Sequence, residues 1–357
     1  MKEVVLVGSG VRAGHYMRSF EVMRDMRVAA VHDPDPARCE AFADRHGCPA
    51  LMDMAAVREA AESGALVLNL LDLPARAAFT RAMIGAGLPV WSEWPMAADF
   101  AGVRALHDLA AEKGVALASA PTTPLSEAGQ ALGRALRGRI AGRILVALAE
   151  MDSGFVQGAR GTYGPDLSGD PLLDQIGPWL SLLVALFGPV RSVTATTRAL
   201  HEGGVPDFTA ATLFFHSGLT AQLTCSALGP RRRRLRVLGE TGTLTMPDAW
   251  DNAVRVFLRR RMVWRGRVID SPIRSRVAVS AAPHPHVPPQ GELAMNLAIG
   301  PDELRNAIAA DRTPRLGGDY ALHLSEVAFA ITGADEDAAT WKMTTTCAVM
   351  EPMSWAL

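Results

Sequence analysis

The stretch that decides the fold is Glu3-Val-Val-Leu-Val-Gly8, which continues as Ser9-Gly10-Val11-Arg12-Ala13-Gly14. Its first part is a continuous run rich in β-branched side chains, which predicts a buried parallel strand. The glycines then follow the spacing G-x-G-x-x-G/A, with Ala13 in the third place, and a helical pattern runs to about Asp25. Gly8 permits the tight turn, Gly10 lets a pyrophosphate approach the backbone, and the helix N-terminus favours negative charge. The stretch therefore predicts a dinucleotide-binding turn, although a strand–helix turn that binds nothing has the same local pattern.

Length and composition predict two domains and exclude several classes of partner. A chain of 357 residues is too long for one ordinary core, and 49% apolar residues are enough to fill two. A net charge of −1 predicts no bulk attraction to nucleic acid or to an anionic membrane. We find no apolar run of membrane-span length and no signal-peptide pattern, so we expect a cytoplasmic protein. The four cysteines and His284-Pro-His286 lack metal-ligand spacing, so we expect no metal site.

An acidic residue follows the second expected strand, Val28-Ala-Ala-Val31, in the sequence His32-Asp33-Pro34. A carboxylate at this place typically holds the adenosine ribose of a dinucleotide. The alternative role of Asp33 is to cap the next helix or to close a turn before Pro34. Arg38 lies close by in the sequence and could meet a 2′-phosphate. We therefore expect NAD or NADP as the cofactor, with Asp33 favouring NAD.

Strands and helices go on alternating, which predicts a doubly wound parallel sheet over residues 1–122. We expect further strands and helices at 36–46, 49–51, 53–61, 66–71, 74–86, 89–91, 99–113 and 115–118. Ligands of such sheets bind at the carboxyl ends of the strands. Leu71-Asp72 and Glu93-Trp94 follow two of these strands, so we expect all four residues to face the cofactor. Arg76 begins the next helix and either contacts the ligand or ends a solvated helix.

The pattern changes after Pro124 and predicts a C-terminal α/β domain over residues 123–357, with an open, mostly antiparallel sheet. Apolar periodicity predicts helices at 125–137, 173–187, 291–310 and 318–334, and strands at 142–151, 190–199, 207–216, 219–227, 234–239, 243–247 and 251–267. We expect a loop over 268–290 and a tail after the last helix. Pro178 is expected in the first turn of its helix, where a missing N–H is harmless. Arg231-Arg-Arg-Arg234 is expected in an exposed turn.

In this order of features the chain resembles the Gfo/Idh/MocA oxidoreductases over nearly its whole length. The residues that carry the resemblance are Gly8–Ala13, Asp33–Pro36, Ser92–Pro95, Leu173–Gly188 and Asp302–Ile308. The resemblance implies a Rossmann domain that binds NAD(P) and a second domain whose open sheet commonly forms the oligomer interface. It therefore implies a homodimer or homotetramer that assembles through the C-terminal sheet.

The chain departs from this family where proton transfer is concerned. The family's Glu-Lys-Pro signature appears as Glu93-Trp94-Pro95, and the only lysines are Lys2, Lys113 and Lys342. The family's Asp-x-Gly-x-His-x-x-Asp pattern keeps its first carboxylate as Asp174. Its histidine and second aspartate are replaced by Pro178 and Ser181. The resemblance thus implies an active site without the usual lysine and histidine.

Two residues are candidates for the missing proton donor. Tyr163 lies in a long Gly-rich segment over 152–171, where a surface anchor is the alternative role. Asp174 precedes an apolar helix, where capping that helix is the alternative role. We expect Trp94, Pro178, Trp179 and Ser181 to line an apolar substrate pocket, although core packing would also explain Trp179.

Three functions remain open on the sequence. The first is an NAD(P)-dependent oxidoreductase that acts on a small specialised-metabolism substrate, at a C=O or C=N bond, with a non-standard proton donor. The second is a redox-neutral isomerase, lyase or cyclase on the same scaffold, with the cofactor retained or lost. The third is a non-catalytic homologue that acts as a binding partner, because the loss of three acid–base positions together is what drift produces.

Overall fold

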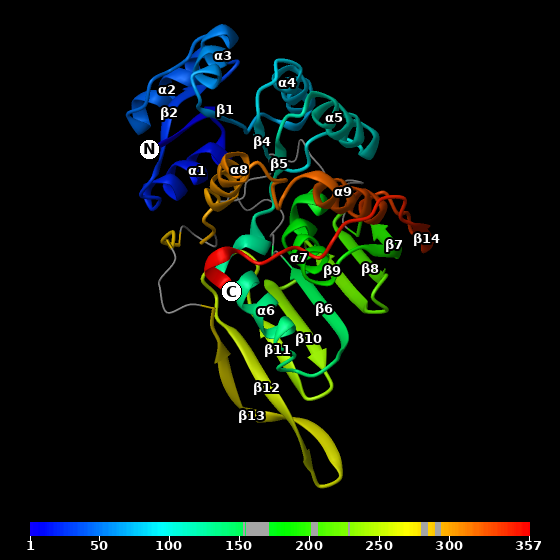
Figure 1. The fold of residues 1–357 in the computed structure, drawn as a ribbon. Coiled ribbons are helices and arrows are strands. Elements are labelled where there is room, and N and C mark those ends of the chain that lie inside the picture. Colours follow the sequence, from blue (N-terminus) through cyan, green and yellow to red (C-terminus); the bar gives the residue numbers. More distant parts are fainter. Residues whose placement is uncertain (153, 155–170, 201–205, 228, 280–284, 290–293) are drawn as a thin grey trace. The chain divides into compact units, whose positions relative to one another are not determined.

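The structure is a computed structural model, and it describes all residues except 153, 155–170, 201–205, 228, 280–284 and 290–293 (Figure 1). The chain divides into two compact units. The first comprises residues 1–122, 285–287 and 295–325, and the second comprises residues 123–284, 288–294 and 326–357. In the part of the chain that is described, no helix is both long and apolar enough to cross a membrane.

The first unit is built on a five-stranded sheet in the order β2-β1-β3-β4-β5. Its strands all run parallel and are β1 (Lys2–Val7), β2 (Met26–His32), β3 (Leu66–Asn69), β4 (Val90–Ser92) and β5 (Leu117–Ser119). The expected strand near 49–51 is reduced to a single bridge between Val31 and Ala50. The centre of the sheet is buried, as the continuous apolar runs require. The expected doubly wound Rossmann sheet is confirmed.

The helices between these strands start in two different ways. They are α1 (Val11–Glu21), α2 (Pro36–His46), α3 (Met54–Glu62), α4 (Leu73–Gly85) and α5 (Phe100–Lys113). Asp35, Asp53 and Asp99 each accept backbone N–H bonds at the start of α2, α3 and α5. By contrast, α1 follows Gly10, which has no side chain, and the side chain of Asp72 makes no capping bond to α4 among the described residues. Both of these helix starts follow the carboxyl ends of strands.

A later segment of the chain returns to the first unit, which differs from the expected single division between residues 122 and 123. Helix α8 (Ile299–Ala309) packs so closely that a Cβ on Gly300 would lie 2.2 Å from Trp91. After α8, Leu316 accepts the N–H of Ser119 at 3.1 Å, which binds this segment to β5. Side-chain bonds add to this association, from Lys2 to Asp302 and from Arg305 to the carbonyl of Glu3. Because the partners lie about 300 positions apart, the association leaves no local pattern in the sequence.

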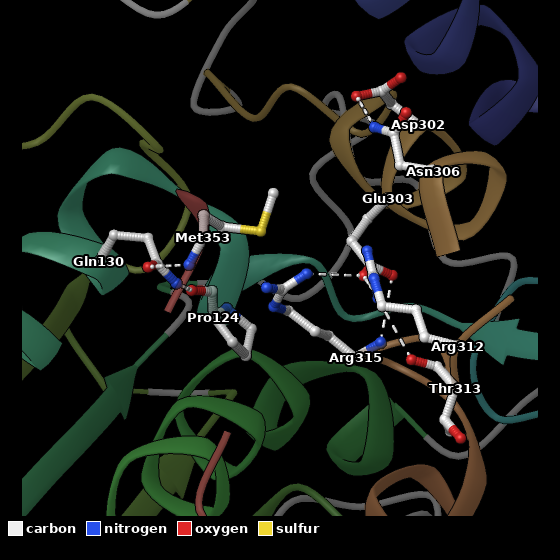
Figure 2. Close-up of polar contacts among 9 residues, drawn as sticks. All are labelled: Pro124, Gln130, Asp302, Glu303, Asn306, Arg312, Thr313, Arg315 and Met353. Atoms are coloured by element: carbon white, nitrogen blue, oxygen red, sulfur yellow. Dashed lines mark hydrogen bonds and ion pairs between the residues drawn. The ribbon is translucent and has the colours of Figure 1, made fainter. Parts of the chain in front are cut away.

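A buried carboxylate organises the connection from α8 to α9 (Gly318–Thr332) (Figure 2). Glu303 is 1% exposed and accepts from the guanidinium of Arg312 at 2.6 Å and from that of Arg315 at 3.1 Å. The N–H of Arg315 donates to the other carboxylate oxygen at 3.1 Å. A buried charge needs such paired donors, so Glu303 fixes the path of this connection.

The second unit contains a nine-stranded sheet in the order β13-β12-β11-β10-β6-β9-β8-β7-β14. Its strands are β6 (Ile144–Asp152), β7 (Val190–Arg198), β8 (Phe208–Phe215), β9 (Thr220–Ser226), β10 (Arg232–Gly239), β11 (Gly242–Met246), β12 (Val256–Trp264), β13 (Arg267–Val277) and β14 (Ala339–Lys342). Only β6 and β9 pair in parallel; the other described pairs are antiparallel. The expected open, mostly antiparallel sheet is confirmed.

The remaining elements of the second unit are η1 (Thr123–Leu125), α6 (Glu127–Arg137), α7 (Pro171–Phe187) and η2 (Ser354–Ala356). Buried and half-buried residues alternate along β6 and β8, as a sheet with one covered face requires. Gln130 on α6 ties the end of the chain to this unit (Figure 2). It donates to the carbonyl of Pro124 at 2.8 Å and accepts the N–H of Met353 at 2.9 Å.

Four expectations for the second unit were wrong. Pro178 lies inside α7 rather than in its first turn, since the helix begins at Pro171. Strand β13 occupies residues 268–277 of the expected loop over 268–290, and β14 occupies part of the expected tail. Three of the arginines in Arg231–Arg234 belong to β10 rather than to an exposed turn.

Arg233 shows why the arginine run can enter a strand. Its side chain is 1% exposed, and its guanidinium lies 2.9 Å from Asp248 and 4.2 Å above the ring of Trp250. A carboxylate and an aromatic face together compensate a buried guanidinium. The partners come from residues 15 and 17 positions later, so a local reading of the arginine run missed them.

The turn at Gly8 makes a sharp prediction about stability. Gly8 has φ +105°, and a Cβ there would lie 2.7 Å from the carbonyl carbon and oxygen of Leu70. Gly47 has φ +65°, with no described atom within 4 Å of its Cβ position. We expect Gly47→Ala to lower the free energy of unfolding by ~1 kcal/mol, the cost of left-handed strain alone. Gly8→Ala should lower it by well over that amount, because the added Cβ also collides with Leu70. Urea denaturation without ligand measures both, and equal losses would contradict the close approach.

Candidate active site

The turn after β1 is bonded to the residue after β2. Ser9 donates from its backbone N–H and from its hydroxyl to the same oxygen of Asp33, both at 2.7 Å. The N–H of Asp35 donates to the other oxygen at 2.9 Å. Burial raises the pKa of Asp33, but these hydrogen bonds and the nearby Arg38 outweigh it, so the net pKa lies below its usual value. Asp35, rather than Asp33, caps α2, whereas the bond from the Asp35 N–H makes Asp33 the side chain that closes the turn at Pro34. The ribose-binding role of Asp33 stays a prediction.

Arg38 lies beside the same turn. Its guanidinium is 3.5 Å from the carboxylate of Asp33, and its side chain is 51% exposed. A Cβ on Gly10 would be 3.8 Å from the same guanidinium, so Arg38 extends over the glycine turn. Asp33 and Arg38 therefore come together at the carboxyl ends of β1 and β2.

A second cluster forms at the carboxyl ends of β3 and β4. Arg76 donates from Nε to the carbonyl of Leu71 at 3.0 Å and from Nη1 to the carbonyl of Pro95 at 2.6 Å. Asn69 donates to the carbonyl of Arg76 and accepts the N–H of Leu71. Arg76 thus clamps the loop after β3 to the loop after β4, a role that neither expected alternative included. The exposed side chain of Asp72 lies next to this clamp at the start of α4.

The buried centre of the site is a chain of three side chains, which come from α1, from β4 and from the residue that follows β4. Tyr16, which is fully buried, donates to Oε1 of Glu93 at 2.7 Å. Trp91 donates from its indole N–H to the Tyr16 oxygen, also at 2.7 Å. Burial and the negative charge of Glu93 raise the pKa of Tyr16 well above its ordinary value, so the phenol stays protonated and donates.

Arg12 completes this chain. Its Nε lies 3.3 Å from Oε2 of Glu93, whose side chain is 5% exposed. His15, one turn of α1 later, has a pKa lowered to about 4 by burial and by the charges of Arg12 and Arg18, and it is therefore neutral at pH 7. Sequence reasoning included Arg12 and Glu93 but missed Tyr16. The signal that could have found it is its position on the apolar face of α1, together with the need of a buried carboxylate for donors.

Trp94 follows Glu93 and is 4% exposed. Its indole N–H is buried and has no hydrogen-bond partner among the described residues. A buried N–H without a partner costs free energy, so the Trp94 indole is a candidate donor to a bound molecule.

The candidates in the second unit lie on or near α7. Asp174 is exposed in the first turn of the helix. Trp179 is fully buried, and its indole N–H donates to the carbonyl of Glu150 on β6 at 3.0 Å. This hydrogen bond ties α7 to β6. Ser181 is buried and donates to the carbonyl of Pro178 at 2.9 Å. Tyr163 lies outside the described residues. The pocket and proton-donor roles of these residues stay predictions.

The first unit fits a dinucleotide at the carboxyl ends of its strands. Gly10 leaves the start of α1 open to an anion, because no side chain caps it and no acidic residue occupies its first turn. The carboxylate of Asp33 and the guanidinium of Arg38 lie beside this turn. Gly8, Ser9, Gly10, Val11, Arg12, Asp33 and Arg38 would hold the adenosine and phosphate part, and Leu71, Asp72, Arg76, Glu93 and Trp94 would border the nicotinamide part.

Sequence comparison agrees with this geometry. Residues 2–120 match the oxidoreductase family with an NAD-binding Rossmann fold, and residues 130–245 match the Gfo/Idh/MocA C-terminal domain. The chain belongs to the Gfo/Idh/MocA family. The first unit is thus the NAD(P)-binding Rossmann domain of this family. No curated protein sequence matches the chain.

Solved structures share the fold at low sequence identity. Aldose-aldose oxidoreductase from Caulobacter crescentus, complexed with glycerol, is 20% identical, with a TM-score of 0.75 over 96% of this chain and 99% of that one. KijD10, a 3-ketoreductase from Actinomadura kijaniata, was solved with NADP and TDP-benzene and is 19% identical, with a TM-score of 0.74 over 94% and 98%. An oxidoreductase from Agrobacterium radiobacter, with NAD+, L-tartaric acid and magnesium, is 16% identical, with a TM-score of 0.74 over 96% and 98%.

The buried chain of side chains predicts a strong coupling between Tyr16 and Glu93. Tyr16→Phe leaves the Trp91 N–H without its acceptor and removes one of the donors to Glu93, so we expect a loss of about 1–3 kcal/mol in the free energy of unfolding. In a cycle with Glu93→Ala, the two losses should not add, because both substitutions break the same bond. Chemical denaturation of the four proteins without ligand measures this, and additive losses would show that the two groups are energetically independent.

Proposed function

We propose that this protein is an NAD(P)-dependent oxidoreductase that reduces a C=O or C=N bond of a small specialised-metabolism substrate, or catalyses the reverse reaction. The proposal rests on how groups are arranged at the carboxyl ends of the first unit's strands. An uncapped helix start at Gly10 lies beside Asp33, and the end of β4 is fixed through Glu93. When bound there, the nicotinamide ring supplies the hydride. The groups of the chain bind and orient it.

The charges beside the glycine turn favour NAD over NADP. The lowered pKa of Asp33 keeps its carboxylate ionised at pH 7. A 2′-phosphate placed near this carboxylate would be repelled, whereas ribose hydroxyls can donate to it. Arg38 offsets part of that repulsion, but its guanidinium already faces Asp33 at 3.5 Å. These contacts support NAD as the preferred cofactor.

Trp94 supports a ligand at the end of β4. Its buried indole N–H lacks a partner among the described residues, and it follows Glu93, which is held from two sides by Tyr16 and Arg12. A fixed backbone at this place positions the indole donor for a polar group of the cofactor or the substrate. The side chain that replaces the family lysine would then act in binding and not in proton transfer.

Two of the three lysines lie at the end of the first unit opposite its strand-end site. Lys2 starts β1 and donates to Asp302 at 2.6 Å, and Lys113 ends α5 beside Glu112. Both positions belong to the amino ends of the parallel strands, opposite the site. Lys342 lies on β14 in the second unit. A non-standard donor is therefore part of the proposal, and Tyr163 and Asp174 remain its two candidates.

Cofactor binding and hydride transfer test the proposal in two steps. In calorimetric titration we expect NADH to bind in the micromolar range and NADPH more weakly. Arg38→Ala should weaken NADPH further while changing NADH by less than about threefold, because the guanidinium has no phosphate to meet in NADH. No binding of either cofactor at millimolar concentration would overturn the proposal.

The second step uses NADH deuterated at C4 with a panel of ketones and cyclic imines. Deuterium in a product is the expected result. If NADH binds and a substrate is converted without gaining deuterium, oxidoreduction is excluded for that substrate. The redox-neutral function would then be the one supported.

The proton donor makes a separate prediction. Once a substrate is identified, Tyr163→Phe or Asp174→Asn should lower the rate of reduction about 10²–10⁴-fold, the usual contribution of a general acid. The loss should appear in kcat, with NADH affinity unchanged in titration, since neither residue is among those proposed to hold the cofactor. The matched control is Asp152→Asn, which changes a carboxylate of the second unit that has no proposed role. Unchanged turnover in both variants would rule out both donors.

A further inference from the structure

Strands β12 and β13 form a long hairpin at one edge of the second unit's sheet, and residues 256–277 are called the arm here (Figure 1). Strand β11 pairs with β12 only along Phe257–Arg260. Beyond this pairing, residues 262–269 form a two-stranded ribbon that is called the tip. Arg265 and Gly266 close the tip in left-handed conformations, with φ values of 50° and 74°, as a tight two-residue hairpin requires.

The tip consists of five apolar residues, two arginines and one glycine. All of its apolar residues are exposed, and the exposed fraction is highest for Val263, at 72%, and for Val268, at 65%. Trp264 follows at 54%. A two-stranded ribbon is only marginally stable in water, and clustered exposed apolar side chains mark interaction surfaces. The tip therefore has the composition of a segment that is covered when the protein works.

The apolar side chains lie on both faces of the tip. Val263 pairs with Val268, and Met262 pairs with Ile269. Successive side chains of a strand point to opposite faces, so these two pairs lie on opposite faces of the ribbon. The surface of a folded protein covers one face of a ribbon and leaves the other in water, whereas the interface of a lipid bilayer surrounds an inserted tip. The distribution of the apolar residues therefore favours a bilayer.

Positive charge is concentrated on the same hairpin. The arm has seven arginines and one acidic residue, Asp270, a net charge of +6, whereas the whole chain has −1. Arg265 and Arg267 are exposed within the tip, and the guanidinium of Arg265 lies 4.6 Å from the centre of the Trp264 ring. Charges farther away than about 8 Å are screened at physiological ionic strength. An approaching anionic surface therefore meets the charge of the arm rather than that of the whole chain.

A nucleic acid, which is also anionic, fits the tip less well. Proteins contact phosphates and base edges mainly through hydrogen-bonding side chains. Residues 262–269 include no Asn, Gln, Ser or Thr, and their apolar side chains would stay in water beside a phosphate backbone. Trp, by contrast, is enriched at membrane interfaces, where Arg packs its stem on apolar surface and keeps its charge in water.

We propose that the tip of the arm inserts into the surface of an anionic lipid bilayer. Trp264 and the two valines lie among the headgroups and the first acyl carbons, and Arg265 and Arg267 pair with lipid phosphates. Each limb of the tip has four residues and spans about 13 Å, at about 3.3 Å per residue, which is less than half of the ~30 Å hydrocarbon core. The tip thus anchors the protein at one surface without crossing the bilayer.

Co-sedimentation of the full chain with lipid vesicles tests the proposal. We expect the wild type to bind phosphatidylcholine vesicles that contain about 40% phosphatidylglycerol, and to bind pure phosphatidylcholine vesicles at least about tenfold more weakly. Binding should weaken as salt increases from about 0.05 M to about 0.5 M. The anionic vesicles should also slow hydrogen–deuterium exchange in residues 262–269, with no comparable change in the edge strand β14.

Two variants of the tip separate the role of charge from that of apolar insertion. Arg265→Gln with Arg267→Gln should weaken binding to the anionic vesicles at least about tenfold, because two charges beside the headgroups are lost. Val263→Thr with Val268→Thr should weaken binding at least about threefold, because threonine keeps the strand preference of valine but not its apolar surface.

The matched controls are Arg58→Gln with Arg81→Gln, and Val349→Thr, which make the same changes at exposed positions outside the arm. Both controls should bind like the wild type, and circular dichroism should show that every variant is folded. The proposal fails if the wild type does not bind the anionic vesicles, if it binds duplex DNA equally well, or if only one tip variant loses binding or neither does. Slowed exchange in residues 262–269 without vesicles, increasing with protein concentration, would show that a second copy covers the tip, which also overturns the proposal.

Discussion

A buried carboxylate, Glu93, holds together the edge of the first unit that the proposed chemistry requires. It receives the Tyr16 hydroxyl on one oxygen and faces the Arg12 guanidinium with the other. Trp91 holds the Tyr16 hydroxyl in place by donating its indole N–H to the phenol oxygen. A charge removed from water is stable only with such donors, so the position of α1 and the end of β4 are determined together. The glycine turn and Trp94 acquire fixed positions as a consequence.

The same constraint explains why the site combines rigid loops with hydrogen-bond donors that have no partner among these fixed groups. Arg76 clamps the two neighbouring loops through their carbonyls, and Ser9 ties the first turn to Asp33. Among these fixed groups, the indole N–H of Trp94 and the uncapped start of α1 remain as donors for a ligand. A preorganised edge of this kind lowers the entropic cost of binding an extended cofactor.

The sequence predicted the elements whose signals are local. The spacing of Gly8, Gly10 and Ala13 placed the first turn, and the bounds of α2 matched residue for residue because Pro36 and Gly47 mark its ends. Tyr16, the return of α8 and the buried Arg233 were not predicted, since their partners lie far away in the chain. Strand β13 was missed because its exposed side chains lack the alternation of a half-buried strand. The residues of the site that depend on long-range donors thus required the structure.

Hydrogen–deuterium exchange with and without NADH tests the central claim, that the strand ends fixed by Glu93 bind a dinucleotide. We expect NADH to slow exchange in peptides that contain Gly8–Arg12, Leu71-Asp72 and Glu93-Trp94, with no comparable change at Arg137 or in β13. The protection around Glu93 should be lost in Tyr16→Phe, while that around Gly8–Arg12 is only reduced. Protection confined to the second unit, or none at saturating NADH, would contradict the account.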